Sequence, residues 1–580
     1  MFRKIYVFLL VLAVFLPAPA FATIYYVAKT GNNANVGTEA SPWLTIQKAA
    51  DTMVAGDTVN VKGGTYNEVV TPKASGTEGS RITYQRFATD NVTIDRASAG
   101  NHTILFSLSF PSNFVTMNGF KVTGALRWNI YIEGKNNVIL EDIESFNSGE
   151  QGVFVVSSNN ITLTRPIARN NTQYGILISD TNNEIFIDNP LTHSNTLDGL
   201  RIFGTNGTRS ATNIDIISPI SHTNGRQGIK TGWADFVYIL NPTTYGNGAT
   251  GIQIENGTDH WIINGGDSHD NGTSFDQETG FWGDEGKFGL LQNSRSYRNS
   301  KGGFYSQSYN TIVRRNRFYS NKHQAKASPI DGANMTAWGD SEGSVDSGGQ
   351  PVGLKDNVFV HNTSYDNGIS TSNGHYWNVN SLASILDNKI KNNIFSQFAG
   401  IREIYVNDTD YVINHNCYFN SARVLNFKWG ATDNLTFANW KTTSGQDANS
   451  INSDPLMVDP ANGDFLLQSG SPCKDAGGFL TTANGSGTNS VTLIVNDSRY
   501  FMDGYGIITG DTIQIQGGGT AVITAVNYTT HTLTLATPLT WTTGNGVSYL
   551  YNGALPDIGY SETAGSPPPS DVNFFRRRIQ

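Results

Sequence analysis

Three stretches of the sequence decide the fold: residues 195–203 read NTLDGLRIF, residues 224–232 read NGRQGIKTG and residues 247–255 read NGATGIQIE. Each begins with Asn, and each has a Gly four residues later, followed by an apolar residue. The same Gly marker recurs with steps of 23, 24, 29, 23, 29 and 23 residues at Gly152, Gly175, Gly199, Gly228, Gly251, Gly280 and Gly303. A nearly constant step predicts equivalent coils stacked along one axis.

Two further columns keep this rhythm. The first consists of Asn147, Asn170, Asn195, Asn224, Asn247, Asn271, Asn299, Asn321 and Asn367, and we expect their side chains to hydrogen-bond along the axis. The second consists of rings two residues before most of these Asn: His193, His222, Tyr245, His269, Tyr297, Tyr319 and Tyr365. We interpret the histidines as members of a stacked interior or turn ladder rather than as metal ligands.

The segments between the markers are short and β-branched, such as residues 213–217 and 261–263, and are bounded by Asn and Gly. No stretch has the 3.6-residue apolar period of a helical solenoid, and the consensus of a leucine-rich array is missing. The prediction is an all-β fold, a right-handed parallel β-helix. Because one coil cannot bury its apolar face alone, stacking supplies the core.

The ends of the chain differ from the repeat. An apolar stripe at helical spacing (Ile46, Ala49, Ala50, Met53) predicts an N-terminal capping helix, and alternation such as residues 532–535 predicts a small inserted antiparallel β module. The predicted organisation is a signal peptide at 1–22, a cap and first coil at 23–80, a β-helix at 81–480 with a loop insertion at 323–353, the module at 487–552, a closing segment at 553–565 and a disordered tail at 566–580.

The N-terminus predicts export. Arg3 and Lys4 precede a short apolar run, and residues 20–22 offer small residues for cleavage, with an uncleaved anchor as the alternative. We therefore expect a secreted, periplasmic or cell-surface monomer with no transmembrane segment after cleavage. The net charge of −9 and the lack of a basic stripe argue against nucleic-acid binding. Cys417 and Cys473 either form a disulfide or pack as buried thiols.

The strand after each marker Gly predicts where chemistry occurs. Its first and third residues are mostly apolar and should point inward, so its second and fourth residues should form two outward columns. The first column reads Tyr131, Phe154, Leu177, Arg201, Lys230, Gln253, Trp282 and Tyr305, and the second reads Glu133, Val156, Ser179, Phe203, Gly232, Glu255, Asp284 and Gln307. From Arg201 onward, the mixture of charges, amides and aromatic rings suits a sugar polymer, with Gln253, Trp282, Tyr305 and Gln307 as substrate-binding residues.

Glu255 and Asp284 are expected one coil apart in one column. Such a pair can share a proton, bind a hard cation such as Ca²⁺, or act as acid and base. Asp276 and Glu278 would add oxygen ligands for the metal. Lys230 and Arg201 could bind a uronate carboxylate or act as a catalytic base. The alternative is that all four charged groups are solvated surface residues.

Residues 55–68, AGDTVNVKGGTYNE, resemble the opening of β-helical polysaccharide lyases, including the family-nine pectate lyases and the chondroitinase B and alginate lyase group. Residues 454–456, 463–465 and 471–477 look like the closing coil of the same superfamily. The resemblance implies the fold and, more loosely, β-elimination on a uronate-containing polysaccharide. The clustered calcium aspartates of family nine are not kept: Asp198 precedes its Gly, but later coils have Gln227, Thr250, Thr279 and Gly302 there.

Three functions therefore compete. The leading one is a polysaccharide lyase, with Lys230 or Arg201 as base and a cation held by Glu255 and Asp284. The second is a non-catalytic glycan-binding or cell-surface protein. The third is a glycoside hydrolase or an epimerase, the hydrolase using Glu255 and Asp284 as its carboxylate pair.

Overall fold

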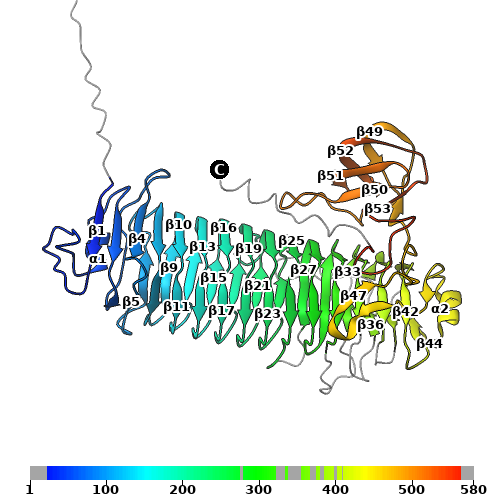
Figure 1. Cartoon of the computed structure of the whole chain (residues 1–580), viewed down its shortest axis with the longest axis horizontal. Coiled ribbons are helices and arrows are strands. Elements are labelled where there is room, and N and C mark those ends of the chain that lie inside the picture. The colour runs from blue at the N-terminus through cyan, green and yellow to red at the C-terminus, as the bar shows by residue number, and fades with distance from the viewer. Residues whose placement is uncertain are drawn as a thin grey trace, which may run out of the picture.

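The computed structural model describes residues 22–274, 279–321, 333–337, 354–365, 374–378, 385–397, 402–407 and 409–563. They form an elongated solenoid with a separate sheet near the C-terminal end (Figure 1). The predicted signal peptide (except Ala22), most of the 323–353 loop and the tail from residue 566 lie outside these residues. None of the helices in the described ranges has the length and apolarity needed to cross a bilayer.

Each coil contributes strands to three faces, and every strand pairs in parallel with its counterpart in the next coil. In one coil these strands are β24 (Ile252–Glu255), β25 (Asp259–Asn264) and β26 (Asp267–His269). In the next coil, β27 (Thr279–Gln292) turns the corner between the first two faces, and β28 (Arg295–Tyr297) follows on the third. The predicted right-handed parallel β-helix is confirmed.

Besides β24 and β27, the first face contains β6 (His102–Phe106), β9 (Trp128–Glu133), β12 (Val153–Val156), β15 (Ile176–Ser179), β18 (Leu200–Phe203), β21 (Ile229–Gly232), β29 (Gly302–Tyr309), β32 (Ala333–Ala337), β36 (Gly374–Asn378), β40 (Ile404–Val406) and β43 (Phe427–Trp429). The strands β33 (Leu354–Lys355) and β37 (Ile385–Leu386) pair beside it, and β44 (Thr432–Leu435) pairs with β43 antiparallel.

The second face contains, besides β25 and the second half of β27, the strands β1 (Ile24–Val27), β2 (Thr58–Val61), β4 (Ile82–Arg86), β7 (Val115–Asn118), β10 (Asn136–Glu141), β13 (Asn159–Thr164), β16 (Asn182–Asp188), β19 (Ala211–Ile217), β22 (Ala234–Leu240), β30 (Ile312–Arg314), β34 (Val358–Val360), β38 (Asn388–Lys391) and β41 (Tyr411–Asn414).

The third face contains, besides β26 and β28, the strands β3 (Gly64–Tyr66), β5 (Val92–Asp95), β8 (Phe120–Thr123), β11 (Glu144–Phe146), β14 (Ile167–Arg169), β17 (Leu191–His193), β20 (Ile220–His222), β23 (Thr243–Tyr245), β31 (Arg317–Tyr319), β35 (Thr363–Tyr365), β39 (Ile394–Ser396), β42 (Cys417–Phe419) and β45 (Ile451–Asn452).

A single apolar core runs along the axis. Alternate residues of each strand point inward, so Ile252 and Ile254 are 0% and 1% exposed. The core cluster extends from Val27 to Trp440. Its N-terminal end is covered by α1 (Ile46–Ala50), which Thr45 caps and which buries Ile46, Ala49 and Ala50. Near the other end, α2 (Phe437–Ser444) buries Trp440.

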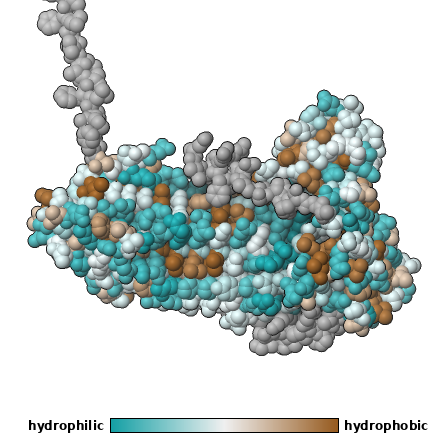
Figure 2. Space-filling view, viewed as in Figure 1, coloured by the Kyte–Doolittle hydropathy of each residue, from teal (hydrophilic) through white to brown (hydrophobic). Residues whose placement is uncertain are grey.

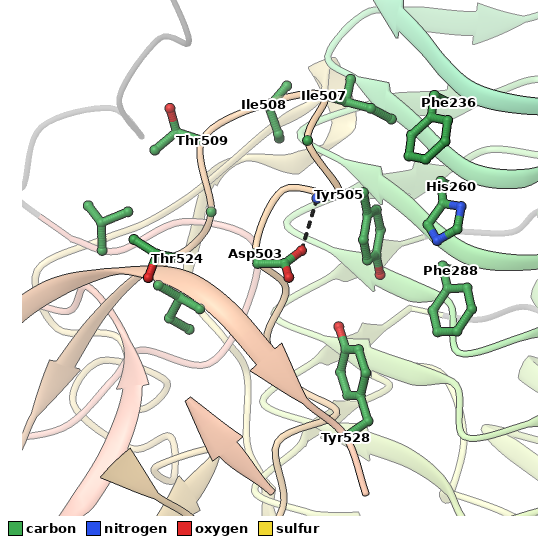
Figure 3. Close-up of a pocket in the computed structure, with 14 residues that line it drawn as sticks. Phe236, His260, Phe288, Asp503, Tyr505, Ile507, Ile508, Thr509, Thr524 and Tyr528 are labelled. Atoms are coloured by element: carbon green, nitrogen blue, oxygen red, sulfur yellow. Dashed lines mark hydrogen bonds between the residues drawn. The ribbon is translucent and has the colours of Figure 1, made fainter. Parts of the chain in front are cut away.

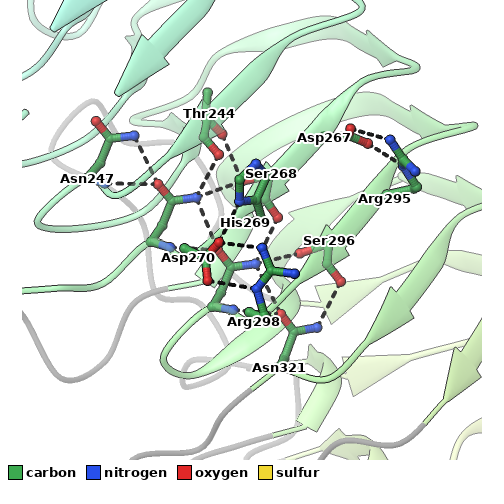
Figure 4. Close-up of polar contacts among 12 residues, drawn as sticks. Thr244, Asn247, Asp267, Ser268, His269, Asp270, Arg295, Ser296, Arg298 and Asn321 are labelled. Carbon is green, nitrogen blue, oxygen red and sulfur yellow. Dashed lines mark hydrogen bonds and ion pairs between the residues drawn. The ribbon is translucent and has the colours of Figure 1, made fainter. Parts of the chain in front are cut away.

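A ladder of buried asparagines joins successive coils on the third face. The Asn247 amide nitrogen donates to Asn271 Oδ1 at 2.9 Å, and the same contact recurs along the axis (Figure 4). Its members are Asn171, Asn195, Asn224, Asn247, Asn271, Asn299 and Asn321. The prediction was wrong by one residue at the start: Asn147 and Asn170 occupy left-handed corners, and Ser148 and Asn171 lie in the ladder. Asn367 lies outside the described residues.

A second ladder, which the sequence analysis missed, continues at another corner through Asn316, Asn362, Asn393 and Asn416. Its steps of 46, 31 and 23 residues hide the repeat, because insertions separate its coils. The predicted ring stack is present: the centroids of His193 and His222 are 5.0 Å apart, and those of His222 and Tyr245 are 4.6 Å apart. Its rings are partly exposed on the outer side of the third face rather than interior.

The antiparallel module is also present. Its six-stranded sheet consists of β48 (Thr481–Thr482), β49 (Gly487–Ile494), β50 (Thr512–Ile515), β51 (Gly519–Asn527), β52 (Thr532–Trp541) and β53 (Gly546–Tyr549). Its apolar residues share one core with outward residues of the second face, including Tyr238, Ile262 and Leu290. In the space-filling view the module stands on the C-terminal half of the solenoid (Figure 2).

The segments that flank the module meet. The Ile558 amide donates to the Cys473 carbonyl at 2.9 Å, and the Asp475 amide donates to Asp557 Oδ1 at 2.7 Å. The module therefore interrupts a single closing segment. Cys417 and Cys473 are free and buried in one small apolar cluster, where burial raises the pKa of the Cys417 thiol. The structure thus has the buried-thiol alternative.

One further strand pair precedes the closing segment in the sequence. It consists of β46 (Met457–Asp459) and β47 (Asp464–Leu467), which pair antiparallel around the short 3-10 helix η1 (Pro460–Asn462).

Candidate functional site

The first outward column is continuous along the first face. The register aligns Arg201 with Lys230, Lys230 with Gln253, Gln253 with Trp282, and Trp282 with Tyr305. The second column aligns Gly232 with Glu255 and Asp284 with Gln307. The predicted columns are therefore confirmed as neighbouring rows on β18, β21, β24, β27 and β29.

Lys230 and Glu255 form an ion pair. Their Nζ and Oε2 atoms are 2.8 Å apart, and the side chains are only 8% and 12% exposed. The contact is diagonal, since the two residues lie in different columns and successive coils. Gly232 is level with Glu255 on the previous coil, and the Phe203 ring lies so close to it that a Cβ atom there would come within 2.3 Å of the ring. The pair fixes the ammonium in a largely buried position within the first column.

Asp284 lies beside this pair as a carboxyl group in an unfavourable environment. Burial raises its pKa well above the usual range, and the charges of Glu285 and Glu255 raise it further. Gln253 Nε2, 3.5 Å from Asp284 Oδ2, and the charge of Lys230 act in the opposite direction. Glu255 and Asp284 thus form an asymmetric pair, in which Glu255 is neutralised by Lys230 and Asp284 favours its protonated form.

Arg201 is held rigidly. Its Nη1 atom lies 3.1 Å from Oδ2 of Asp198, whose side chain is fully buried. The guanidinium also lies over the rings of Tyr174 and Phe203, with its central carbon 5.2 and 4.6 Å from the centroids. A guanidinium remains charged at all physiological pH values. Arg201 is therefore suited to bind an anion rather than to remove a proton.

The neighbouring polar groups include unsatisfied atoms. The Gln227 side-chain nitrogen donates to Gln253 Oε1 at 2.8 Å, but Gln227 Oε1 is buried and has no partner among the described residues. Trp282 Nε1 is likewise a buried donor that no described residue accepts. Buried polar atoms normally find partners, so these two are available to the hydroxyl groups of a ligand. Gln227 was missed as a site residue, although its place immediately before the marker Gly was a usable signal.

The remaining predicted binding residues follow along the columns. The Trp282 and Tyr305 rings meet edge to face with centroids 5.1 Å apart, and the Lys301 ammonium lies 4.9 Å from the Tyr305 centroid. Gln307 is level with Asp284 on the next coil. Asp276 and Glu278, two of the four predicted metal ligands, lie outside the described residues. Within the described ranges, no three His, Cys, Asp or Glu side chains gather closely enough to hold a metal ion.

Comparisons with known proteins agree with this architecture. Residues 25–175 match the family model of a Pel9A-like, right handed beta helix region, and residues 106–266 match that of a right handed beta helix region. The chain is a right-handed parallel β-helix protein. The second match includes β18 to β25 of this β-helix protein, and with them Arg201, Lys230 and Glu255.

Two curated proteins are similar over shorter ranges. The β-helix protein is 31% identical over 159 residues to pectate lyase L of Dickeya dadantii (strain 3937), which is 27% of this chain and 34% of that protein. It is 38% identical over 76 residues to the uncharacterized protein YwoF of Bacillus subtilis (strain 168), which is 13% of this chain and 16% of that protein. The matched region therefore spans about a third of the length of pectate lyase L and about a sixth of the length of YwoF.

Three solved structures are similar to this chain at low identity. Pectate lyase Pel9A has 15% identity and a TM-score of 0.30, with 81% of this chain and 94% of that chain covered. A mutant of the PL6 family alginate lyase AlyGC has 11% identity and a TM-score of 0.45, with coverages of 74% and 55%. The A-module of the mannuronan C-5 epimerase AlgE4 of Azotobacter vinelandii has 15% identity and a TM-score of 0.36, with coverages of 61% and 87%.

Proposed function

We propose that this protein is an exported polysaccharide lyase that cleaves a uronate-containing polysaccharide by β-elimination. The observation that carries the proposal is the Lys230–Glu255 ion pair together with Asp284, a nearby carboxyl group that burial keeps in its protonated form. The sequence similarity to a pectate lyase supports a uronate substrate. The N-terminus resembles a secretory signal, which supports export. Export is consistent with a polymeric substrate that lies outside the cell.

The residues divide the chemistry between them. Arg201 binds the uronate carboxylate and neutralises its negative charge, and this makes the C5 proton more acidic. Lys230 accepts that proton once its ammonium has released one to water, while the C4–O bond breaks and the C4–C5 double bond forms. Asp284, held protonated by its surroundings, gives its proton to the departing oxygen. Glu255 orients Lys230 between turnovers.

Calcium binding would need the complete predicted ligand set, which consists of Glu255, Asp284, Asp276 and Glu278. The two described members do not suit a metal by themselves, because Lys230 already neutralises Glu255 and Asp284 favours its protonated form. No step of the proposed reaction therefore uses a metal ion.

The test is an ultraviolet assay of the purified mature protein on pectate, alginate and chondroitin, with added calcium and with a chelator. A rising absorbance shows the unsaturated product of β-elimination, and Lys230→Met should abolish it. Glu184→Gln, an exposed carboxylate on the second face, serves as a control. Binding of the polymers without any cleavage would instead indicate a non-catalytic glycan-binding protein.

The asymmetry between Glu255 and Asp284 also favours a second candidate, a glycoside hydrolase. In such an enzyme a protonated carboxyl acts as the acid and an ionised one as the base or nucleophile. A hydrolase would produce new reducing ends without ultraviolet absorbance. Measuring both signals on the same digest separates the two chemistries.

A further inference from the structure

A cavity lies around the corner from the candidate site, between the β-helix and the antiparallel module. Its volume is about 960 Å³. The β-helix contributes Phe236, His260 and Phe288, and the module contributes Asp503, Tyr505, Thr509, Thr524 and Tyr528 among others (Figure 3). A cavity of this size can accommodate a small ligand. No step of the proposed reaction uses it.

The rings that line one wall are stacked. Phe236 and His260 have centroids 4.9 Å apart at an angle of 7°, and His260 and Phe288 have centroids 5.1 Å apart at 6°. Successive coils align these three residues at one corner. All three are partly exposed. The stacking covers the ring faces that they turn toward one another, and Tyr505 meets His260 and Phe288 edge to face at 5.4 and 6.1 Å, so the rings offer the cavity their remaining edges. Apolar ring edges of this kind can pack against the C–H groups of a sugar ring.

The backbone conformation of these three residues is energetically unfavourable for an aromatic side chain such as Phe. Phe236, His260 and Phe288 have φ values of 54°, 44° and 55°, in the left-handed region that bulky residues avoid. At the same corner, the preceding coils place Asn160, Glu184 and Asn213 with similar φ values. Asn adopts this conformation readily, whereas Phe does so at a cost. Aromatic residues thus replace the favourable residue type in the coils that line the cavity.

The polar groups in the cavity are acidic or neutral. Asp503 is present, with its Oδ1 atom accepting the Tyr505 amide at 3.0 Å, and the hydroxyls of Thr509 and Thr524 line the opposite side. His260 is paired through Nδ1 with Asp235 Oδ1 at 2.8 Å. No Lys or Arg appears among the described residues that line the cavity. A uronate carboxylate would therefore meet an acidic group and no fixed cation, while a neutral sugar would meet hydrogen-bond acceptors and rings.

The cavity and the candidate site are close along the chain. Glu255 belongs to the site and His260 to the cavity, and both lie on one coil; Asp284 and Phe288 repeat the arrangement on the next. We propose that this cavity is a binding subsite for a neutral sugar residue of the same polysaccharide. The proposal rests on the proposed function and narrows the substrate to a heteropolysaccharide in which neutral sugars lie near the cleaved uronate.

The test uses the whole protein carrying Lys230→Met, so that no cleavage occurs. Binding of short neutral xylo-, gluco-, galacto- and manno-oligosaccharides and of short oligouronates is measured by calorimetry. We expect at least one neutral series to bind and Phe236→Asn to weaken that binding by about tenfold. Asn fits the left-handed backbone better than Phe, so a thermal transition close to that of the parent would show that the loss is not a folding defect. Glu184→Asn, at the equivalent corner outside the cavity, should leave binding unchanged.

The outcomes separate this proposal from the proposed function. Binding only of oligouronates, or neutral binding that Phe236→Asn does not affect, overturns the subsite. Absence of any binding also overturns it, and the ultraviolet assay on the wild-type protein then still decides independently whether the protein is a lyase. Neutral binding that is lost in Phe236→Asn supports the subsite even if no uronate polymer is cleaved.

Discussion

Lys230 Nζ lies 2.8 Å from Glu255 Oε2, although the two residues occupy different columns and different coils. Gly232 is level with Glu255 on the previous coil, and the Phe203 ring packs against it. A pair of this kind is both a structural contact and a way to hold a reactive amine in one place. Removing either partner leaves the other charge in a largely buried position, and this cost exceeds the net worth of the pair itself.

We expect Lys230→Met to lower the turnover number by at least about a hundredfold, because it removes the proposed base. Glu255→Gln should lower it less, by about tenfold, since the amine stays but loses its orientation. Both are measured as initial rates of ultraviolet absorbance on the best substrate. Equal and mild effects of the two substitutions would indicate that the pair is structural.

Asp284 gives the activity a pH dependence. Its pKa is raised, so the protonated form needed for the proposed acid is present at low pH and is lost as the pH rises through the raised value. The rate should therefore fall on the alkaline side, and Asp284→Asn should remove activity over the whole range. A rate profile that keeps its alkaline limb in Asp284→Asn would assign that limb to another group.

Glu403 makes stability depend on pH. It is fully buried, and burial raises its pKa to about 8 despite the Arg423 Nη2 atom 2.7 Å away. Because the folded-state pKa lies above the unfolded one, the contribution of Glu403 is fully present below the unfolded pKa, about 4.3, and is lost as the pH rises through about 8.

Glu403→Gln should accordingly flatten the dependence of the melting temperature on pH between these values. Thermal unfolding followed by circular dichroism across this range checks it. The exposed residue Glu78 provides the matched control, Glu78→Gln, which should leave the slope as in the wild-type protein. An unchanged slope in Glu403→Gln would show that other groups dominate the pH dependence.

The asparagine ladder predicts a large local cost. The Asn247 side chain donates to Asn271 Oδ1 and to the Ser221 carbonyl, and its Oδ1 atom accepts from the backbone and side chain of Asn224. Asn247→Ala leaves several buried groups unpaired and should destabilise the protein by about 3 kcal/mol or more. Denaturant unfolding measures this, with exposed Asn159→Ala as a control expected to stay within about 0.5 kcal/mol. A small effect at Asn247 would mean that water replaces the ladder contacts.

The solenoid could be predicted from sequence because its periodicity is repeated in every coil. The marker Gly fixes the register, so the composition of both outward columns, from Tyr131 to Tyr305 and from Glu133 to Gln307, followed from alternation alone. The errors arose where two chemically similar residues are adjacent. At residues 170 and 171 both are Asn, and only the φ value of the first shows which one forms the corner.

The electrostatics of the site could not be predicted in the same way. A column assignment places Lys230 opposite Gln253, and nothing in the spacing indicates that it bends diagonally to Glu255. The raised pKa of Asp284 depends on burial by neighbouring segments, which a repeat pattern does not encode. The cavity beside Phe236 is hidden for a related reason, since most of its lining residues belong to the module, more than two hundred positions further along the chain.

The two ends of the antiparallel module are tied together by the Cys473–Ile558 and Asp475–Asp557 hydrogen bonds. A segment whose entry and exit coincide can be gained, lost or exchanged as a cassette without altering the path of the chain on either side. In this protein the cassette also forms one wall of the cavity. Exchange of such cassettes would let evolution change which polymers a β-helix holds while the coils that face the cleaved bond stay the same.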